Sequence, residues 1–117
     1  MHGDAHESYL VRKVLFVCGK NRRRSPTAEA LFSGQAGIEV SSAGTAADAD
    51  CPVSGDLIEW ADTIFVMESR HTRQLRKQFG PLLRDKRIIS LDIPDSYELM
   101  QPELVELLQA RVSPRLR

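Results

Sequence analysis

A cysteine and an arginine are separated by five residues near the beginning of the chain, in the segment Cys18-Gly-Lys-Asn-Arg-Arg-Arg24-Ser25. A bend of this length can wrap its backbone N–H groups around a tetrahedral oxyanion, and the positive end of a following helix dipole adds to the attraction. Arg24 can close the ring with the two parallel donors of its guanidinium. The same positive field favours Cys18 as a thiolate, the form of cysteine that attacks phosphorus. The segment therefore predicts a phosphate-binding loop that consists of Gly19, Lys20, Asn21, Arg22, Arg23, Arg24 and Ser25 and follows a nucleophile.

Two further residue types suit such a loop. The hydroxyl of Ser25 can donate a hydrogen bond to the thiolate, and asparagine, as at position 21, tolerates the left-handed backbone conformation that a tight loop requires. A simpler interpretation makes Cys18 a small buried residue at a strand end and the arginines a solvated turn. That interpretation leaves the spacing of Arg24, Ser25 and Pro26 unexplained, so the functional interpretation is favoured.

The loop needs a strand before it and a helix after it. Residues 11 to 18 contain the apolar run Val14-Leu15-Phe16-Val17, which is typical of a strand buried on both faces. Ser25 is predicted to cap the helix that follows, with Pro26 at its first position. The basic loop would thus join a buried strand to the N-terminus of a helix.

The rest of the chain repeats this alternation. Further strands are expected at residues 38 to 40, 63 to 67 and 87 to 93. Helices are expected at 52 to 61, after a Ser69 cap through Phe79 to Gly80-Pro81, and after Pro102. Right-handed crossovers between such strands predict one open parallel sheet of the α/β class, with strand order 2-1-3-4 and helices on both faces. Ligands bind such sheets at the carboxyl ends of the strands, beside strand one, where the basic loop lies.

Composition limits the classes of protein to consider. The 117 residues are 42% hydrophobic and 27% charged, which predicts one domain at residues 10–117 behind a mobile tail at residues 1–9. The formal net charge is zero, although residues 11 to 24 carry six basic side chains and residues 25 to 69 carry eight acidic ones. No apolar segment is long enough for a membrane span, and no signal peptide precedes the domain, so a cytoplasmic location is expected. Two cysteines without metal-ligand spacing predict no metal and no cofactor.

The segment VLFVCGKNRRRSPTAEALF resembles the phosphate loop and first helix of the low-molecular-weight protein tyrosine phosphatases, whose signature is cysteine, five residues, arginine, serine and proline. The resemblance continues through Ser42-Ala43-Gly44-Thr45, IFVMESRHTRQL and Ile93-Pro94-Asp95-Ser96-Tyr97, and so covers most of the chain. It implies a flavodoxin-like fold of the phosphotyrosine phosphatase I type. It also implies metal-independent hydrolysis of phosphomonoesters through a phosphocysteine. By this resemblance Cys18 is the nucleophile, Arg24 binds the transition state, Ser25 donates to the thiolate, Asn21 and Ser42 support the loop, and Asp95 is the general acid and base.

The chain also departs from the family pattern. Arg23 stands where many members have a second loop cysteine, Lys20 stands where they have glycine, and the acid loop contains DSY in place of DPYY. A shorter connection between strands two and three removes part of the cleft wall and a histidine that supports the loop in many members. These departures concern the substrate more than the chemistry.

Several assignments have competitors. Asp92 competes with Asp95 for the role of acid, but an acid in the cleft-facing loop reaches the leaving oxygen more easily. Lys20, Arg22 and Arg23 form either a solvated rim or a surface for acidic substrates. Tyr97 is expected to line the cleft, and His71 is expected to be solvated.

The expected partners are a phosphorylated protein or a small phosphomonoester, with nucleic-acid phosphate less favoured and no membrane. Two other classes of function remain open. An arsenate reductase needs further cysteines, of which only Cys51 is present. A non-catalytic phosphate-binding module would need Arg24 but not a thiol at position 18.

Overall fold

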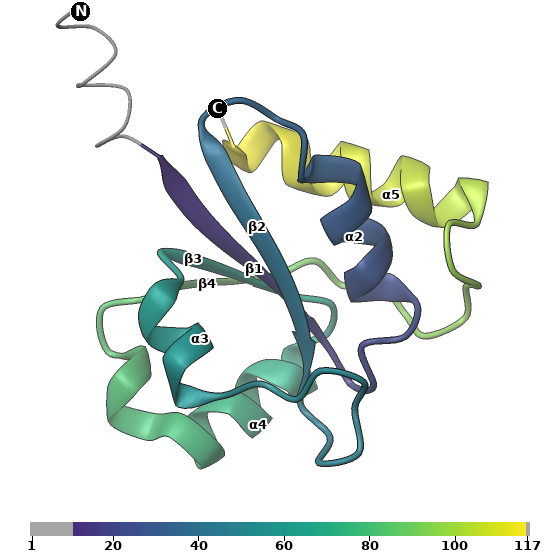
Figure 1. Ribbon diagram of the computed structural model, residues 1–117. Coiled ribbons are helices and arrows are strands. Elements are labelled where there is room, and N and C mark those ends of the chain that lie inside the picture. Colours follow the sequence, from purple (N-terminus) through teal and green to yellow (C-terminus); the bar gives the residue numbers. More distant parts are fainter. Residues whose placement is uncertain (1–10, 117) are drawn as a thin grey trace, which may run out of the picture.

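The computed structural model describes residues 11–116, so the tail expected at residues 1–9 lies outside the described part. A four-stranded parallel sheet forms its centre, with helices on both sides (Figure 1). The strand order β2-β1-β3-β4 confirms the predicted topology. The strands are β1 (Arg12–Cys18), β2 (Ile38–Gly44), β3 (Thr63–Val66) and β4 (Arg87–Ser90), and the α-helices are α2 (Arg24–Phe32), α3 (Gly55–Trp60), α4 (Ser69–Phe79) and α5 (Pro102–Val112). Two short 3-10 helices, η1 (Gly80–Leu83) and η2 (Ser113–Leu116), complete the elements.

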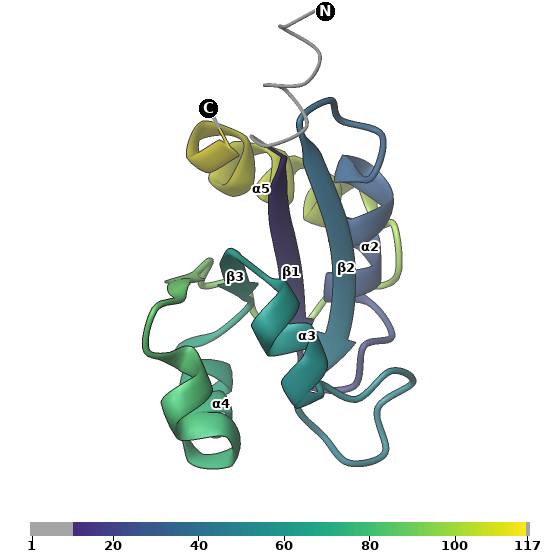
Figure 2. The ribbon, with the colours of Figure 1, turned by 60° about the vertical axis from the view of Figure 1, so that its left-hand side comes forward.

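Alternate residues of β1 enter two separate cores. Val14 and Phe16 face the side covered by α2 and α5. The ring of Phe16 stacks on the rings of Phe65 and Phe32, with centroid distances of 5.4 and 5.8 Å. Leu15 and Val17 face the side covered by α3 and α4, where Ile64 and Leu75 are also buried. Figure 2 shows the two helical layers on either side of the sheet. Because β1 is buried on both faces, its residues Val14 to Val17 are all apolar and do not alternate with polar ones.

Strand β2 is longer than the sequence predicts. Ser41 and Ser42 have the composition of a loop, but β2 pairs with β1 along its full length, from Ile38 opposite Arg12 to Gly44 opposite Cys18. Small polar residues are tolerated here because β2 is an edge strand with one neighbour. The extension brings Ser42 beside the phosphate loop.

Strand β4 is shorter than predicted, because Asp92 adopts a left-handed backbone conformation with φ of 55°. Pairing with the neighbouring segment nevertheless continues, since the N–H of Leu91 donates to the carbonyl of Val66 at 2.8 Å and that of Ile93 to Met67 at 2.8 Å. The segment after β4 is therefore held against β3 up to Ile93. It is this pairing that positions the residues that follow, including Asp95.

Two predicted helix ends are wrong. Helix α2 begins at Arg24, and its N-cap residue Arg23 makes no side-chain hydrogen bond, so Ser25 lies inside the helix and does not cap it. Helix α3 begins at Gly55 instead of residue 52, because the Ser54 hydroxyl accepts the N–H of Leu57 as a cap. The sequence thus predicts a cap at Ser25, which does not act as one, and does not predict the cap at Ser54.

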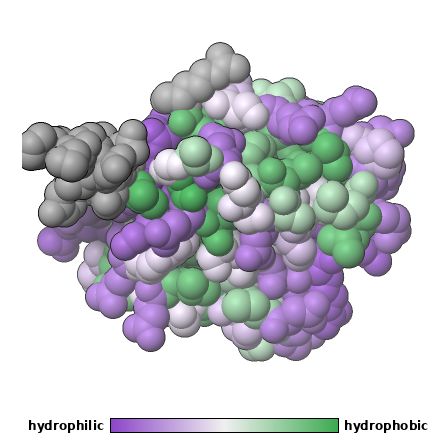
Figure 3. Space-filling model, turned by 45° about the horizontal axis from the view of Figure 1, so that its top comes forward, coloured by the Kyte–Doolittle hydropathy of each residue, from purple (hydrophilic) through white to green (hydrophobic). Residues whose placement is uncertain are grey.

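On the face in Figure 3, hydrophobic residues lie in several groups among hydrophilic ones. Large hydrophobic side chains that are exposed in the described part include Leu82, Leu99 and Met100. Within residues 11–116, no helix combines the length and the apolar character needed to cross a membrane.

Candidate active site

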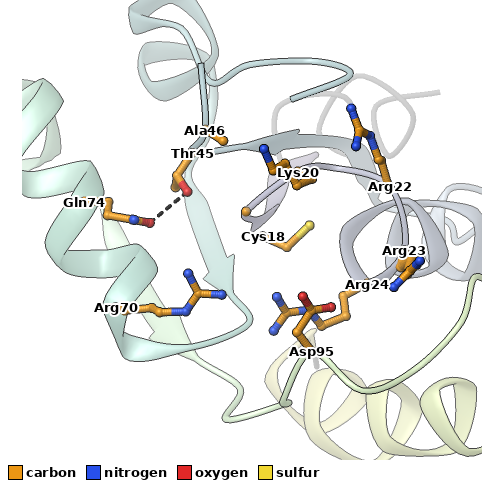
Figure 4. Close-up of a pocket in the computed structure, with 11 residues that line it drawn as sticks. Cys18, Lys20, Arg22, Arg23, Arg24, Thr45, Ala46, Arg70, Gln74 and Asp95 are labelled. Carbon is orange, nitrogen blue, oxygen red and sulfur yellow. Dashed lines mark hydrogen bonds and ion pairs between the residues drawn. The ribbon is translucent and has the colours of Figure 1, made fainter. Parts of the chain in front are cut away.

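A cavity of about 360 Å³ opens at the carboxyl ends of the strands. The loop after β1 forms one side of it, and the loop after β2, the first turns of α4 and the loop after β4 form the rest (Figure 4). This is the position that the topology predicted for a ligand. The cavity is lined by Cys18, Gly19, Lys20, Arg22, Arg23, Arg24, Thr45, Ala46, Arg70, Gln74 and Asp95.

The sulfur of Cys18 lies at the centre of this lining and is almost fully buried. The Ser25 hydroxyl is 2.9 Å from Cys18 Sγ, and the backbone N–H of Asn21 donates to the same sulfur at 3.3 Å. Ser25 lies in the first turn of α2, so the positive end of the helix is directed toward the sulfur. A thiolate accepts hydrogen bonds and donates none, so in that state the Ser25 hydroxyl is the donor.

Asn21 occupies the left-handed region with φ of 58°, as its residue type predicted. Its amide nitrogen donates to the hydroxyls of Ser25 at 2.9 Å and Ser42 at 3.0 Å. Ser42 in turn donates to Glu29 Oε1 at 2.5 Å. These four residues form a continuous network that connects the loop to β2 and α2. Glu29 is a member of this network that sequence reasoning missed, because only the fold brings α2 alongside the end of β2.

Arg24 is 3% exposed at its side chain and is held in one orientation. Its Nη1 donates to Glu68 Oε1 at 2.7 Å and to the backbone carbonyl of Ile93 at 2.7 Å. Asp95 Oδ1 lies 3.7 Å from Arg24 Nε, at the mouth of the cavity. Sequence analysis did not assign Glu68 to the site. Its signal was its position directly after the apolar run of β3, at the edge where ligands bind.

Glu68 is shared by two cations. Burial raises the pKa of Glu68, but hydrogen bonds and Coulomb attraction from Arg24, and then from Arg70, outweigh burial and leave the pKa below its ordinary value. Glu68 is therefore a carboxylate at neutral pH. It holds Nη1 of Arg24, while Nε of the same guanidinium lies 3.7 Å from Asp95 Oδ1.

The prediction that His71 is solvated is wrong. His71 is fully buried, and burial, followed by repulsion from Arg70 and Arg24, lowers its pKa to about 4. Its Nδ1 accepts the backbone N–H of Glu68 at 3.1 Å, so the single proton of the neutral ring is on Nε2. Among the buried side-chain nitrogen and oxygen atoms of the described part, Nε2 of His71 is the one without a hydrogen-bond partner. It faces Gly19, since a Cβ added to Gly19 would lie 3.9 Å from this nitrogen. A histidine thus lies beside the phosphate loop, although it comes from α4.

The other predicted residues are divided between the cavity and its surroundings. Tyr97 packs, partly buried, against the core beneath α5 and is not among the residues that line the cavity, contrary to its expected position. Asp92 lines a separate hollow beside α5 and receives a hydrogen bond from Ser90. Lys20, Arg22 and Arg23 lie on the rim, each paired with a carboxylate, Asp48, Asp50 and Glu98 respectively. Among residues 11–116, no cluster of His, Cys, Asp and Glu could hold a metal ion.

A strand that ends in a buried thiol, a loop whose Asn21 N–H donates to that thiol, and a helix that carries a buried arginine define a cysteine-dependent phosphatase. Residues 13–59 match the family model described as low molecular weight phosphotyrosine protein phosphatase. Together with the fold, this match confirms the resemblance of the sequence to the low-molecular-weight protein tyrosine phosphatases.

Solved structures agree with this resemblance. The chain is similar to Wzb from Vibrio vulnificus, solved with benzylphosphonate, at 26% identity and a TM-score of 0.73, over 90% of this chain and 97% of that one. It is similar to the YwlE arginine phosphatase from Geobacillus stearothermophilus at 25% identity and a TM-score of 0.71, over 90% of this chain and 92% of that one. A low molecular weight protein tyrosine phosphatase from Streptococcus pyogenes, at 19% identity and a TM-score of 0.73 over 91% and 93% of the two chains, shares the fold. The search of curated proteins gives no match.

Proposed function

We propose that this protein hydrolyses phosphomonoesters through a covalent phosphocysteine on Cys18, without a metal ion. The observation that carries the proposal is the placement of Cys18 Sγ, which lies at the floor of the cavity within hydrogen-bond distance of Ser25 Oγ and the N–H of Asn21. Both groups stabilise a thiolate. The phosphate of the substrate would occupy the ring of backbone donors, with Arg24 across its oxygens.

In the first step, the Cys18 thiolate attacks phosphorus, and the bond between phosphorus and the leaving oxygen breaks as the S–P bond forms. Protonated Asp95 gives its proton to that oxygen, so the leaving group departs as a neutral alcohol or phenol. In the second step, a water molecule attacks phosphorus, and the Asp95 carboxylate takes its proton. The S–P bond then breaks, inorganic phosphate leaves, and the thiolate is restored.

Arg24 neutralises the charge on the equatorial oxygens during both steps. Its Nη1 already donates to the carboxylate of Glu68 and to the backbone carbonyl of Ile93, which hold the guanidinium in place. Little reorganisation is therefore needed when the charge develops. Lysine cannot replace Arg24, because an ammonium does not provide two parallel donors. Asn21 and Ser42 act indirectly, by holding Ser25 and the loop in position.

The identity of the leaving group is a separate question. The family resemblance favours phosphotyrosine in a protein, whereas one similar structure is named an arginine phosphatase. The attack by cysteine on phosphorus does not depend on this choice. A reductase that passes a disulfide along the chain is disfavoured, since Cys51 is not among the residues that line the cavity.

Turnover of p-nitrophenyl phosphate, with and without EDTA, tests the proposal. We expect hydrolysis that EDTA does not reduce, and we expect Cys18→Ser to lower kcat by more than about 10³-fold, because a hydroxyl is not ionised at neutral pH. Cys51→Ser is the matched control, since this cysteine is exposed and outside the cavity, and it should keep the activity of the parent protein. Full activity of Cys18→Ser would exclude the mechanism.

A further inference from the structure

We propose that the preferred substrate carries a second anionic group close to its phosphate ester, and that Arg70 of helix α4 binds this group. The inference rests on the proposed phosphatase function and adds the class of leaving group. It is carried by the lining of the cavity and by the position of Arg70 opposite the phosphate loop.

The described lining of the cavity offers no ring on which an aromatic leaving group could stack. Within residues 11–116, none of the residues that line the cavity is aromatic, and the neutral side chains among them are small or polar, such as Ala46, Thr45 and Gln74. Thr45 and Gln74 are also joined by a hydrogen bond of 2.8 Å, which presents polar atoms at this wall.

The described lining of the cavity carries more cationic than acidic side chains. Of the residues that the structure describes, five cationic ones line the cavity, namely Lys20, Arg22, Arg23, Arg24 and Arg70, against one acidic residue, Asp95. The carboxylates that pair with the rim cations lie outside this lining, and the pairs are exposed; Lys20 and Asp48, for example, have side-chain exposures of 50% and 69%. Exposed ion pairs contribute about 0–1 kcal/mol, so a substrate anion can replace the protein carboxylate.

Arg70 is the cation best placed for such an exchange. Its guanidinium points across the cavity toward Cys18 and Asp95, from the side opposite the phosphate loop (Figure 4). In the part of the chain that the structure describes, its carboxylate partner is Glu68, whose Oε1 accepts Arg24 Nη1 at 2.7 Å and both Nη2 and Nε of Arg70, at 3.0 and 3.3 Å. One negative charge thus serves two guanidiniums, and Arg70, at 46% side-chain exposure, keeps donors for another anion.

The reacting phosphate is surrounded by the backbone donors of the loop and by Arg24, so Arg70 faces what is attached to that phosphate. A carboxylate or a second phosphate there would meet the two-donor edge of a guanidinium. Gln74, one helical turn further along α4, would provide an additional polar contact. The arrangement selects an anionic leaving group over a neutral one.

A pair of substrates with the same shape tests the proposal: 3-carboxyphenyl phosphate and its neutral counterpart 3-carbamoylphenyl phosphate. For the parent protein we expect kcat/KM for the carboxylate to exceed that for the amide by at least about tenfold, equivalent to about 1.4 kcal/mol. Arg70→Gln should bring this ratio close to one, because it removes the guanidinium that distinguishes the carboxylate from the amide. Arg73→Gln removes the same charge from the same helix outside the cavity and should keep the full ratio.

Two outcomes would overturn the proposal: a ratio near one in the parent protein, or a ratio that survives Arg70→Gln, as it would after an equal loss for both substrates. The last result would mean that Arg70 only supports Glu68 and Arg24. Binding to the Cys18→Ser variant gives a second readout that does not need turnover. Its Kd for the two esters, with and without Arg70→Gln, should show the same preference, so a failure of catalysis and a failure of specificity are distinguishable.

Discussion

Asp95 and Asp92 are three residues apart in the chain but lie in different environments. Asp95 reaches the cavity and lies 3.7 Å from Arg24 Nε, whereas Asp92 receives a hydrogen bond from Ser90 beside α5. The left-handed conformation of Asp92 turns the chain between them, and Ile93 remains paired with Met67. This placement supports the choice of Asp95 as the general acid and base.

Asp95→Asn should lower kcat by roughly 10² to 10⁴-fold for an alkyl phosphate, because its alkoxide leaving group requires a proton. The effect should be much smaller for p-nitrophenyl phosphate, whose phenolate leaves without one. Steady-state rates over a series of esters measure this difference as a steeper dependence on the acidity of the leaving group. Asp92→Asn is the matched control and should follow the parent protein. If Asp92→Asn is instead the impaired variant, the assignment of the acid is wrong by three residues.

At the scale of elements, the phosphate loop is held by the segment that follows β2. The N–H groups of Ala46 and Asp50 donate to the loop carbonyls of Gly19 and Lys20, at 2.9 and 3.0 Å. The two segments approach so closely at Gly44 that a Cβ there would overlap the carbonyl oxygen of Gly19. The basic charges of the first loop and the acidic charges of the second, which are separated in the sequence, thus come together in the fold.

Gly44→Ala should therefore displace the phosphate loop. The added Cβ meets backbone atoms of Gly19 and Asn21, which cannot rotate away, as well as the side chain of Ala49. We expect a loss of about 1–3 kcal/mol in the free energy of unfolding and a fall in kcat/KM of more than about tenfold. Chemical denaturation and steady-state kinetics measure both. Gly34→Ala is the control, because an added Cβ at Gly34 meets nothing within 4 Å; equal effects of the two substitutions would contradict this account.

At the scale of the whole molecule, the fold buries the imidazole ring of His71, a residue of α4, beside the phosphate loop. His71 has a pKa lowered to about 4 by burial and by Arg70 and Arg24, whereas histidine in the unfolded chain titrates near 6.5. Between these values the unfolded chain binds a proton that the folded chain does not. Stability from this residue is thus complete above about pH 6.5 and is lost as the pH falls toward 4.

The free energy of unfolding should accordingly decrease by up to about 3 kcal/mol between pH 7 and pH 4 through His71 alone. Carboxylates also titrate in the lower part of this range, so the comparison is with His71→Asn, whose side-chain oxygen can still accept the N–H of Glu68. The difference between the two pH curves, measured by chemical denaturation, isolates the histidine. Parallel curves would show that folding does not lower the pKa of His71.

Much of the fold was predictable because its signals are local. The apolar run of β1, the alternation of strands with helices, and the rule for right-handed crossovers were sufficient for the sheet order β2-β1-β3-β4. The length of β2 was underestimated, because its end has loop composition and becomes a strand only by pairing with β1. The capping role of Ser25 was wrong, because contact with Cys18 and Asn21 outweighs a local pattern.

The sequence by itself determined the chemistry of the site, since a cysteine, an arginine and a serine at this spacing lie within one continuous loop, and short-range geometry places them around a common anion. The tertiary structure alone decided which distant residues complete the site. Three of these residues come from the segment after β3. Glu68 binds Arg24, His71 lies beside Gly19, and Arg70 lies across the cavity. No local pattern encodes these contacts, because they depend on the register of parallel strands and on the packing of α4 against the sheet.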